Sequence, residues 1–219
     1  SHLKPYGTNY FSYVLIGIAF FSYVSIGVSN FANIIRKEQL MGTLENLFAT
    51  PTKLSTLIAA MGIWNFIWAS IEVIIYLILG VFLFGIDLGQ INLLSAFVIM
   101  ILTIISFSGL GLVAAGFIII LKRGQPITWA VNTLFEVLGG VYFPITVFPG
   151  WLKIISQILP VTYSVRAMQW AVYRGYNLAA LKLEISILSI FSLILLPLGF
   201  ELLKYALRRA KKDASLSHY

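Results

Sequence analysis

Five apolar stretches, separated by short polar segments, dominate this chain. They cover residues 10–35, 54–86, 91–121, 127–147 and 183–206. Each is long enough to cross the hydrocarbon core of a bilayer, which takes about 20 helical residues. The pattern therefore predicts an all-α fold: a polytopic membrane helical bundle that forms a single domain over residues 1–219.

The longest segment between two predicted spans, residues 148–182, is itself patterned. Pro149 and Pro160 bracket the stretch WLKIISQIL, in which Trp151, Ile154 and Ile158 recur at helical spacing. A second stretch, VTYSVRAMQWAVYRG, ends in Gly175, a residue that commonly terminates helices. We predict two interfacial or re-entrant helices here. For most of the aromatic residues in this segment, anchoring at the membrane surface is a sufficient role. The alternative is that the segment forms an outer gate.

Composition and charge agree with a membrane protein. Hydrophobic residues make up 59% of the chain and charged residues 11%, and the mean hydropathy is +0.93. If the amino terminus lies outside, the inner segments hold ten of the 15 Lys and Arg residues. This is the expected bias toward positive charge on the inner side, so we expect a cell (plasma or inner) membrane protein with a cytoplasmic C-terminus. The basic tail then lies near anionic lipid, and nucleic acid is not an expected partner.

The polar segment at residues 36–53 separates the first two spans. Within EQLMGTLENLFA, Leu40, Met41, Leu44, Leu47 and Phe48 share one face of an α-helix, and Glu38, Gln39, Glu45 and Asn46 share the other. One interpretation is a helix that lies passively on the inner leaflet. Its acidic residues favour the other interpretation, in which the apolar face binds a groove on a cytoplasmic partner protein.

Known catalytic and nucleotide-binding motifs are absent from the sequence. There is no G-x-x-x-x-G-K-[ST] phosphate loop, no H-E-x-x-H and no cysteine, so neither ATP hydrolysis by that route nor a thiolate metal site is expected. Two carboxylates, Glu72 and Glu136, fall inside predicted spans, where a charge costs on the order of 3 kcal/mol. Either they line a substrate cavity together with Asn132, or they tie helices together with Asn65 or Asn132 as donors.

Two motifs carry a family resemblance. GTLENLFATP at residues 42–51 and GGVYFPITVFPGWLKIISQILPVTYSVRAMQ at residues 139–169 resemble the two signatures of type-2 ABC exporter permeases of the drug and glycan exporter type. The resemblance implies a dimer of permease subunits, homomeric or heteromeric. It also implies a separate cytoplasmic ATPase subunit that binds ATP and Mg²⁺, so that this chain binds no cofactor. The family has six spans, so we expect a further span upstream of residue 10.

The resemblance also assigns roles to residues. An amphipathic cytoplasmic coupling helix would contact the ATPase through Gly42, Thr43, Leu44, Glu45, Leu47, Phe48 and Pro51. Re-entrant outer helices would close the exit, with Phe143, Pro144, Pro149, Trp151, Pro160 and Tyr163 at the outer gate.

The sequence thus predicts the permease subunit of an ATP-driven exporter. The expected substrate is an amphiphile: a drug, a lipid or a lipid-linked glycan. Two alternatives remain open: an ion-driven secondary transporter or channel that uses Glu72 and Glu136, and a membrane scaffold that recruits a cytoplasmic partner.

Overall fold

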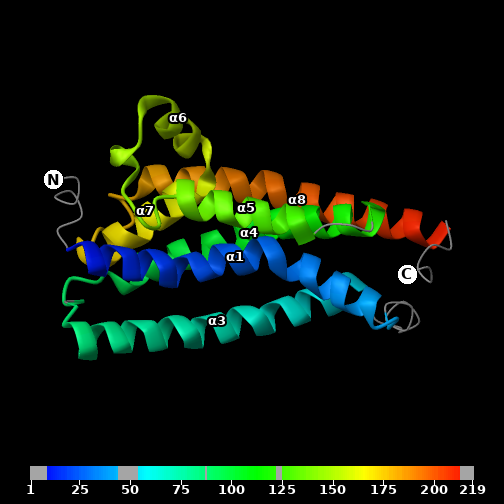
Figure 1. Ribbon diagram of the computed structural model, residues 1–219, viewed down its shortest axis with the longest axis horizontal. Helices are drawn as coiled ribbons and strands as arrows, with labels where there is room; N and C mark the ends of the chain where they lie inside the picture. Colours follow the sequence, from blue (N-terminus) through cyan, green and yellow to red (C-terminus); the bar gives the residue numbers. More distant parts are fainter. Residues whose placement is uncertain (1–8, 44–53, 87, 122–124, 213–219) are drawn as a thin grey trace.

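The computed structural model describes residues 9–43, 54–86, 88–121 and 125–212, and these residues are helical with short connections (Figure 1). The helices are α1 (Tyr10–Leu40), α3 (Leu54–Phe84), α4 (Leu93–Leu121), α5 (Gln125–Leu138), the short 3-10 helix η2 (Ile145–Val147), α6 (Gly150–Ile158), α7 (Pro160–Tyr173) and α8 (Lys182–Lys212). Within the described ranges there is no strand, so the predicted all-α class is confirmed.

Within the residues that the structure describes, four helices have the length and apolar composition of membrane spans. They are Tyr10–Leu40, Gly62–Phe84, Leu93–Ile120 and Lys182–Arg209, and they correspond to four of the five predicted spans. Their backbone N–H and C=O groups need no water as a partner, because an α-helix satisfies its own backbone hydrogen bonds in lipid. The polytopic helical bundle is therefore the observed architecture.

The fifth prediction, a span over residues 127–147, is wrong for its second half. Helix α5 has 14 residues and ends at Leu138. Gly140 then adopts a φ of 80°, which an L side chain rarely adopts, and Pro144 has no amide hydrogen to donate. Apolar character alone therefore overestimated this helix, because the two glycines and the proline stop it.

Helix α4 lies at the centre of the bundle, between α1 and α8 (Figure 1). Glycines set these close contacts. A Cβ on Gly111 would lie 2.1 Å from the carbonyl oxygen of Gly27 in α1, and a Cβ on Gly199 of α8 would lie 2.6 Å from that of Gly109. Helices that are not driven together by water rely on such small residues for contact. Helix α3 packs mainly along α1 and exposes most of its apolar side chains.

The two short helices near the amino-terminal end of α1 differ in burial. Helix α7 is enclosed by the bundle: Val161, Ala167 and Ala171 are fully buried. Helix α6 stands off from the bundle (Figure 1), and Trp151 and Ile158 are 66% and 68% exposed. The two predicted helices are confirmed, and Gly175 with a φ of 60° follows α7 as expected. That they are re-entrant stays a prediction.

Candidate functional site: a cavity between α1 and α3

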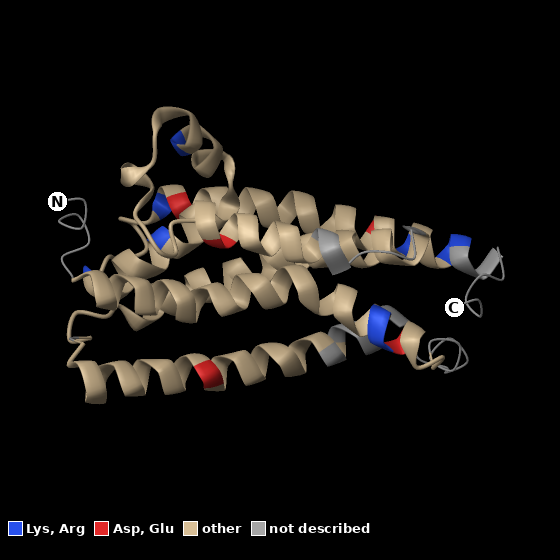
Figure 2. Cartoon of the chain, in the orientation of Figure 1, with Lys and Arg blue, Asp and Glu red and all other residues tan. Residues whose placement is uncertain are grey.

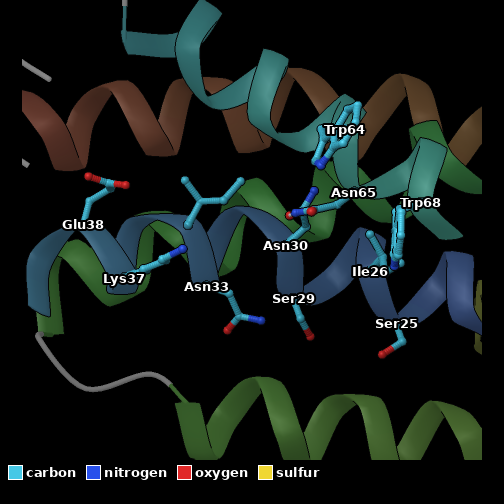
Figure 3. Close-up of a pocket in the computed structure, with 11 residues that line it drawn as sticks. Ser25, Ile26, Ser29, Asn30, Asn33, Lys37, Glu38, Trp64, Asn65 and Trp68 are labelled. Atoms are coloured by element: carbon cyan, nitrogen blue, oxygen red, sulfur yellow. The ribbon is translucent and has the colours of Figure 1, made fainter. Parts of the chain in front are cut away.

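A cavity of about 740 Å³ lies between α1 and α3, toward the end where α1 terminates (Figure 3). Helix α1 supplies its polar side. Ser25, Ser29, Asn33 and Lys37 follow one another at intervals of four residues, and this spacing places them along one side of the helix. A volume of this size is in the range of small-molecule binding sites.

Helix α3 supplies the aromatic side of the same cavity. Trp64 and Trp68 are one helical turn apart and are 64% and 63% exposed, so their rings are available to a bound molecule. Asn65 lies between them in the sequence and also lines the cavity. The site therefore combines hydrogen-bonding groups on one helix with large apolar surfaces on the other.

A hydrogen-bonded pair of asparagines joins the two walls. The Asn30 amide donates to the backbone oxygen of Gly62 at 3.2 Å, and the Asn65 amide donates to the Asn30 side-chain oxygen. Buried polar pairs of this kind are favourable only when their partners are in place, so they fix the spacing of α1 and α3. The cavity is thus held by a specific contact and not by apolar packing alone.

Two ionisable side chains lie at the end of the cavity that is nearest the C-terminal end of α1. Lys37 is exposed and Glu38 is 8% exposed. The hydroxyl of Thr43 donates to Oε2 of Glu38 at 2.5 Å, so one of the two carboxylate oxygens has a partner. Figure 3 shows both side chains, Lys37 and Glu38, on α1. The last turns of α8, which include Arg208 and Arg209, lie at the same end of the bundle (Figure 1). Lys and Arg side chains are present at this end on more than one helix (Figure 2). The Lys37 end of the cavity therefore combines one ammonium group with one carboxylate.

A second, apolar cavity of about 490 Å³ adjoins these helices closer to the amino-terminal half of α1. Its lining includes Phe20, Tyr23, Leu77, Met100 and Met168. Two hydroxyl groups in this lining pair with each other: Tyr23 donates a hydrogen bond to Ser70 at 3.0 Å. Both α1 and α3 line both cavities, so the surface between these two helices changes from apolar to polar toward the end of α1.

Of the three residues predicted to line a substrate cavity (Glu72, Asn132 and Glu136), only Asn132 lies beside one of these two cavities. Asn132 of α5 donates to the Ser29 hydroxyl at 2.5 Å, beside the polar cavity. Glu72 and Glu136 line neither of these two cavities. The idea that Asn65 or Asn132 donates to these carboxylates is wrong for the contacts described: Tyr76 donates to Glu72 at 2.7 Å, and Tyr142 donates to Glu136. The hydrogen bond to Glu136 raises the pKa of Tyr142, in the turn after α5, to about 12.

Only part of the predicted coupling segment lies in the described residues. Helix α1 ends at Leu40, and Gly42 follows with a φ of 67°. The apolar face predicted from Leu40 onward is therefore interrupted at Gly42, which turns the chain. Leu44, Glu45, Leu47, Phe48 and Pro51 lie outside the described residues. The end of α1 and the start of α3 lie at the same end of the bundle (Figure 1).

The predicted gate residues gather around α6 and α7. Pro149 precedes α6, and Pro160 occupies the first turn of α7, where its missing amide hydrogen costs nothing. Pro144 precedes η2, and Phe143 and Trp151 are 49% and 66% exposed. The Tyr163 hydroxyl donates to the backbone oxygen of Gln157 at 2.7 Å, which connects the two helices.

An ion pair near these residues was not predicted. Arg166 of α7 donates to Glu184 of α8 at 2.7 Å, and the Glu184 side chain is 4% exposed. The Arg166 guanidinium also lies 5.0 Å from the Tyr163 ring centre and 5.1 Å from that of Trp170. Glu184 comes 18 residues after Arg166, so no local spacing rule connects them.

The polar side of α1 was also missed as a site. Its signal is present in the sequence: Ser25, Ser29 and Asn33 recur every four residues in an otherwise apolar span, a pattern typical of a side that faces a cavity or another helix. Trp64 and Trp68 repeat at the same interval. Among the described residues, no group of His, Asp or Glu side chains could hold a metal ion.

Comparison with known proteins gives one result that bears on identity. The family model described as ABC-2 type transporter matches residues 3–173, which is more than half of the chain. No curated protein matches. The matched range includes α1 through α7, and hence both cavities and all predicted site residues.

Proposed function

This chain belongs to the ABC-2 type transporter family, and from this premise we propose that it is the permease subunit of an ATP-driven exporter of amphiphilic molecules. As a member it is a membrane component of an ABC transporter, and therefore a transporter subunit and not itself an enzyme. What we propose beyond the family is the direction of transport, the class of substrate, and a separate ATPase subunit as the partner that binds ATP and Mg²⁺.

The observation that carries the substrate class is the change in lining between α1 and α3. An amphiphile has an apolar part and a polar part, and the two neighbouring cavities offer first a hydrocarbon lining and then Ser29, Asn33 and Lys37. A free sugar would leave the apolar cavity without a matching group. A purely apolar molecule would make no use of the hydroxyl, amide and ammonium groups that line the polar cavity.

Coupling to the ATPase is proposed at the connection between α1 and α3. We assign it to Gly42, Thr43, Leu44, Glu45, Leu47, Phe48 and Pro51, with the described ends of both helices on the same end of the bundle. Because α1 and α3 form the cavity walls, a push on their connection would move both walls together. A second permease subunit, the same or different, would complete the transporter.

The ion-driven alternative has less support. It needs Glu72 and Glu136 in a water-filled path, whereas both carboxylates accept hydrogen bonds from tyrosines and neither lines the two cavities. The scaffold alternative predicts a stable partner without ATP-dependent transport, which the experiment below distinguishes.

The test is affinity purification of the protein from its own membranes, followed by an ATPase assay. We expect an ATPase subunit to co-purify, and we expect Leu44→Asp combined with Phe48→Asp to release it. Asn46→Asp is the matched control, because it adds a negative charge to the opposite side of the same segment. Glu45→Ala should retain the partner but uncouple ATP hydrolysis from export.

The exporter proposal fails if the chain purifies alone. It also fails if a partner binds equally well to the Leu44→Asp, Phe48→Asp variant, or if flux follows an ion gradient without ATP.

A further inference from the structure

The polar end of the α1–α3 cavity carries an ammonium group, that of Lys37, which forms no ion pair with a described residue. Lys37 lines the cavity and belongs to neither the Arg166–Glu184 nor the Lys204–Glu201 ion pair. The neighbouring polar lining, Asn33 and Ser29, can also donate hydrogen bonds. A molecule bound here meets an ammonium group and several donors, which suits acceptor oxygens with negative charge.

Glu38 does not cancel this preference. Its carboxylate is 8% exposed and accepts a hydrogen bond from the Thr43 hydroxyl at 2.5 Å. Figure 3 shows the Glu38 and Lys37 side chains extending in different directions from α1, with Lys37 directed along the cavity. Glu38 keeps its negative charge, but Thr43 holds one of its oxygens and its side chain extends in a different direction from that of Lys37, so a ligand beside Lys37 meets the ammonium group.

The depth of the site matches one leaflet of a bilayer. Lys37 follows Tyr23, which lines the apolar cavity, by 14 positions. At about 1.5 Å per residue this is about 21 Å along α1. Half of a bilayer, including its headgroup region, measures about 20–22 Å. Lys37 thus lies at headgroup level when the apolar cavity lies near the midplane, and Trp64 and Trp68 lie between them on α3.

We propose that this cavity binds one anionic amphiphile from the leaflet at the Lys37 end, with its phosphate or carboxylate at Lys37 and its hydrocarbon chain along Trp64 and Trp68 toward Tyr23. That the bound amphiphile is the transported substrate rests on the proposed function. That it binds here rests only on the lining of the cavity. A zwitterionic lipid such as phosphatidylethanolamine is the competing ligand, since Glu38 could meet its ammonium group.

Binding is measured with the chain reconstituted in phosphatidylcholine vesicles. Spin-labelled phosphatidylglycerol, phosphatidylethanolamine and phosphatidylcholine with identical chains are added in turn, and the fraction held by the protein is read from the spectra. One Lys near a membrane surface contributes on the order of 1 kcal/mol, so we expect phosphatidylglycerol to be preferred over phosphatidylcholine by about fivefold. Lys37→Gln should abolish the preference, and Lys37→Arg should retain it.

The matched control is Arg208→Gln, which removes an exposed cation near the end of α8, at the same end of the bundle as the end of α1 (Figure 1). We expect it to leave most of the preference intact. An equal loss in Lys37→Gln and Arg208→Gln would overturn the proposal, since it would indicate general surface electrostatics. Equal binding of phosphatidylethanolamine and phosphatidylglycerol would overturn it as well.

A second readout locates the hydrocarbon chain. Phosphatidylglycerol brominated on its chain should quench tryptophan fluorescence, and the quenching that is specific to this lipid should fall when Trp64 and Trp68 are both changed to Phe. Trp129→Phe, an exposed tryptophan on α5, is the control. Failure of the exporter hypothesis leaves these results unaffected, because no ATPase is present. Loss of lipid selectivity with an intact ATPase complex contradicts the site alone.

Discussion

Replacement of Gly111 by alanine tests the contact between α1 and α4. The new Cβ would lie 2.1 Å from the Gly27 carbonyl oxygen and 3.1 Å from a ring carbon of Phe31. Carbon atoms in proteins are normally separated from their non-bonded neighbours by about 3.5–4.0 Å, so this contact must lengthen by about 1.4 Å or more, and the two helices must move apart. The obstacle is backbone, which cannot rotate away as a side chain can.

The expected cost follows from two opposing contributions. Overpacking a well-filled interior typically costs about 1–3 kcal/mol. Alanine in a helix is favoured over glycine by up to about 1 kcal/mol, which offsets part of that cost. We therefore expect a net destabilisation of about 1–2 kcal/mol. For a chain of this length, this corresponds to a decrease in Tm of about 2–8 °C.

Unfolding of the purified protein, followed by intrinsic fluorescence during heating in one fixed lipid or detergent, measures this change. Gly116→Ala in the same helix is the control. Its Cβ would lie 3.2 Å from the Leu202 side chain, which can adjust, so its Tm should stay the same or rise slightly. If Gly111→Ala is as stable as the parent while Gly116→Ala is not, the assigned contact between α1 and α4 is wrong.

Three further predictions concern polar contacts, each measured by the same unfolding assay. Glu184→Gln should destabilise by about 1–3 kcal/mol, because Arg166 loses its buried counter-charge; restoration of the pair as Arg166→Glu with Glu184→Arg should recover part of the loss. Tyr13→Phe should cost about 1–2 kcal/mol, since its hydroxyl donates to the Gly140 oxygen at 2.6 Å; Tyr76→Phe, at an exposed contact, should cost much less. Asn30→Leu should cost about 2–4 kcal/mol, because it leaves both Asn65 and the Gly62 oxygen without their partner, and equal stability would contradict that role.

The sequence predicted the helices well where composition alone decides. Long apolar runs gave α1, α3, α4 and α8, since any such run must form a helix to satisfy its backbone in lipid. The prediction was less accurate at helix ends. Helix α1 continues to Leu40, past its basic residues, because Lys and Arg are good helix formers. Helix α5 stops at Leu138, because Gly140 and Pro144 matter more than hydropathy there.

The candidate site was predicted only in part. Asn132 does lie beside the cavity, through Ser29, but the two carboxylates do not line it. The cost of a charge in a span indicates that such a carboxylate needs a partner. A tyrosine hydroxyl meets this need as well as a substrate cavity does. The sequence does not single out Trp64, Trp68 or Lys37, because each is an ordinary residue for a span or its end. Only the packing of α1 against α3 brings them to one cavity.

The sequence by itself determined that this protein is a helical membrane protein, because hydrophobicity and helix propensity act locally, and its motifs indicated a family that the comparison confirmed. The tertiary structure decided which polar residues face one another. Ser29 meets Asn132, Asn30 meets Asn65 and Arg166 meets Glu184 across separations of 103, 35 and 18 residues. Such contacts depend on how whole helices pack, which the glycines at their seams set, and no local pattern encodes that arrangement.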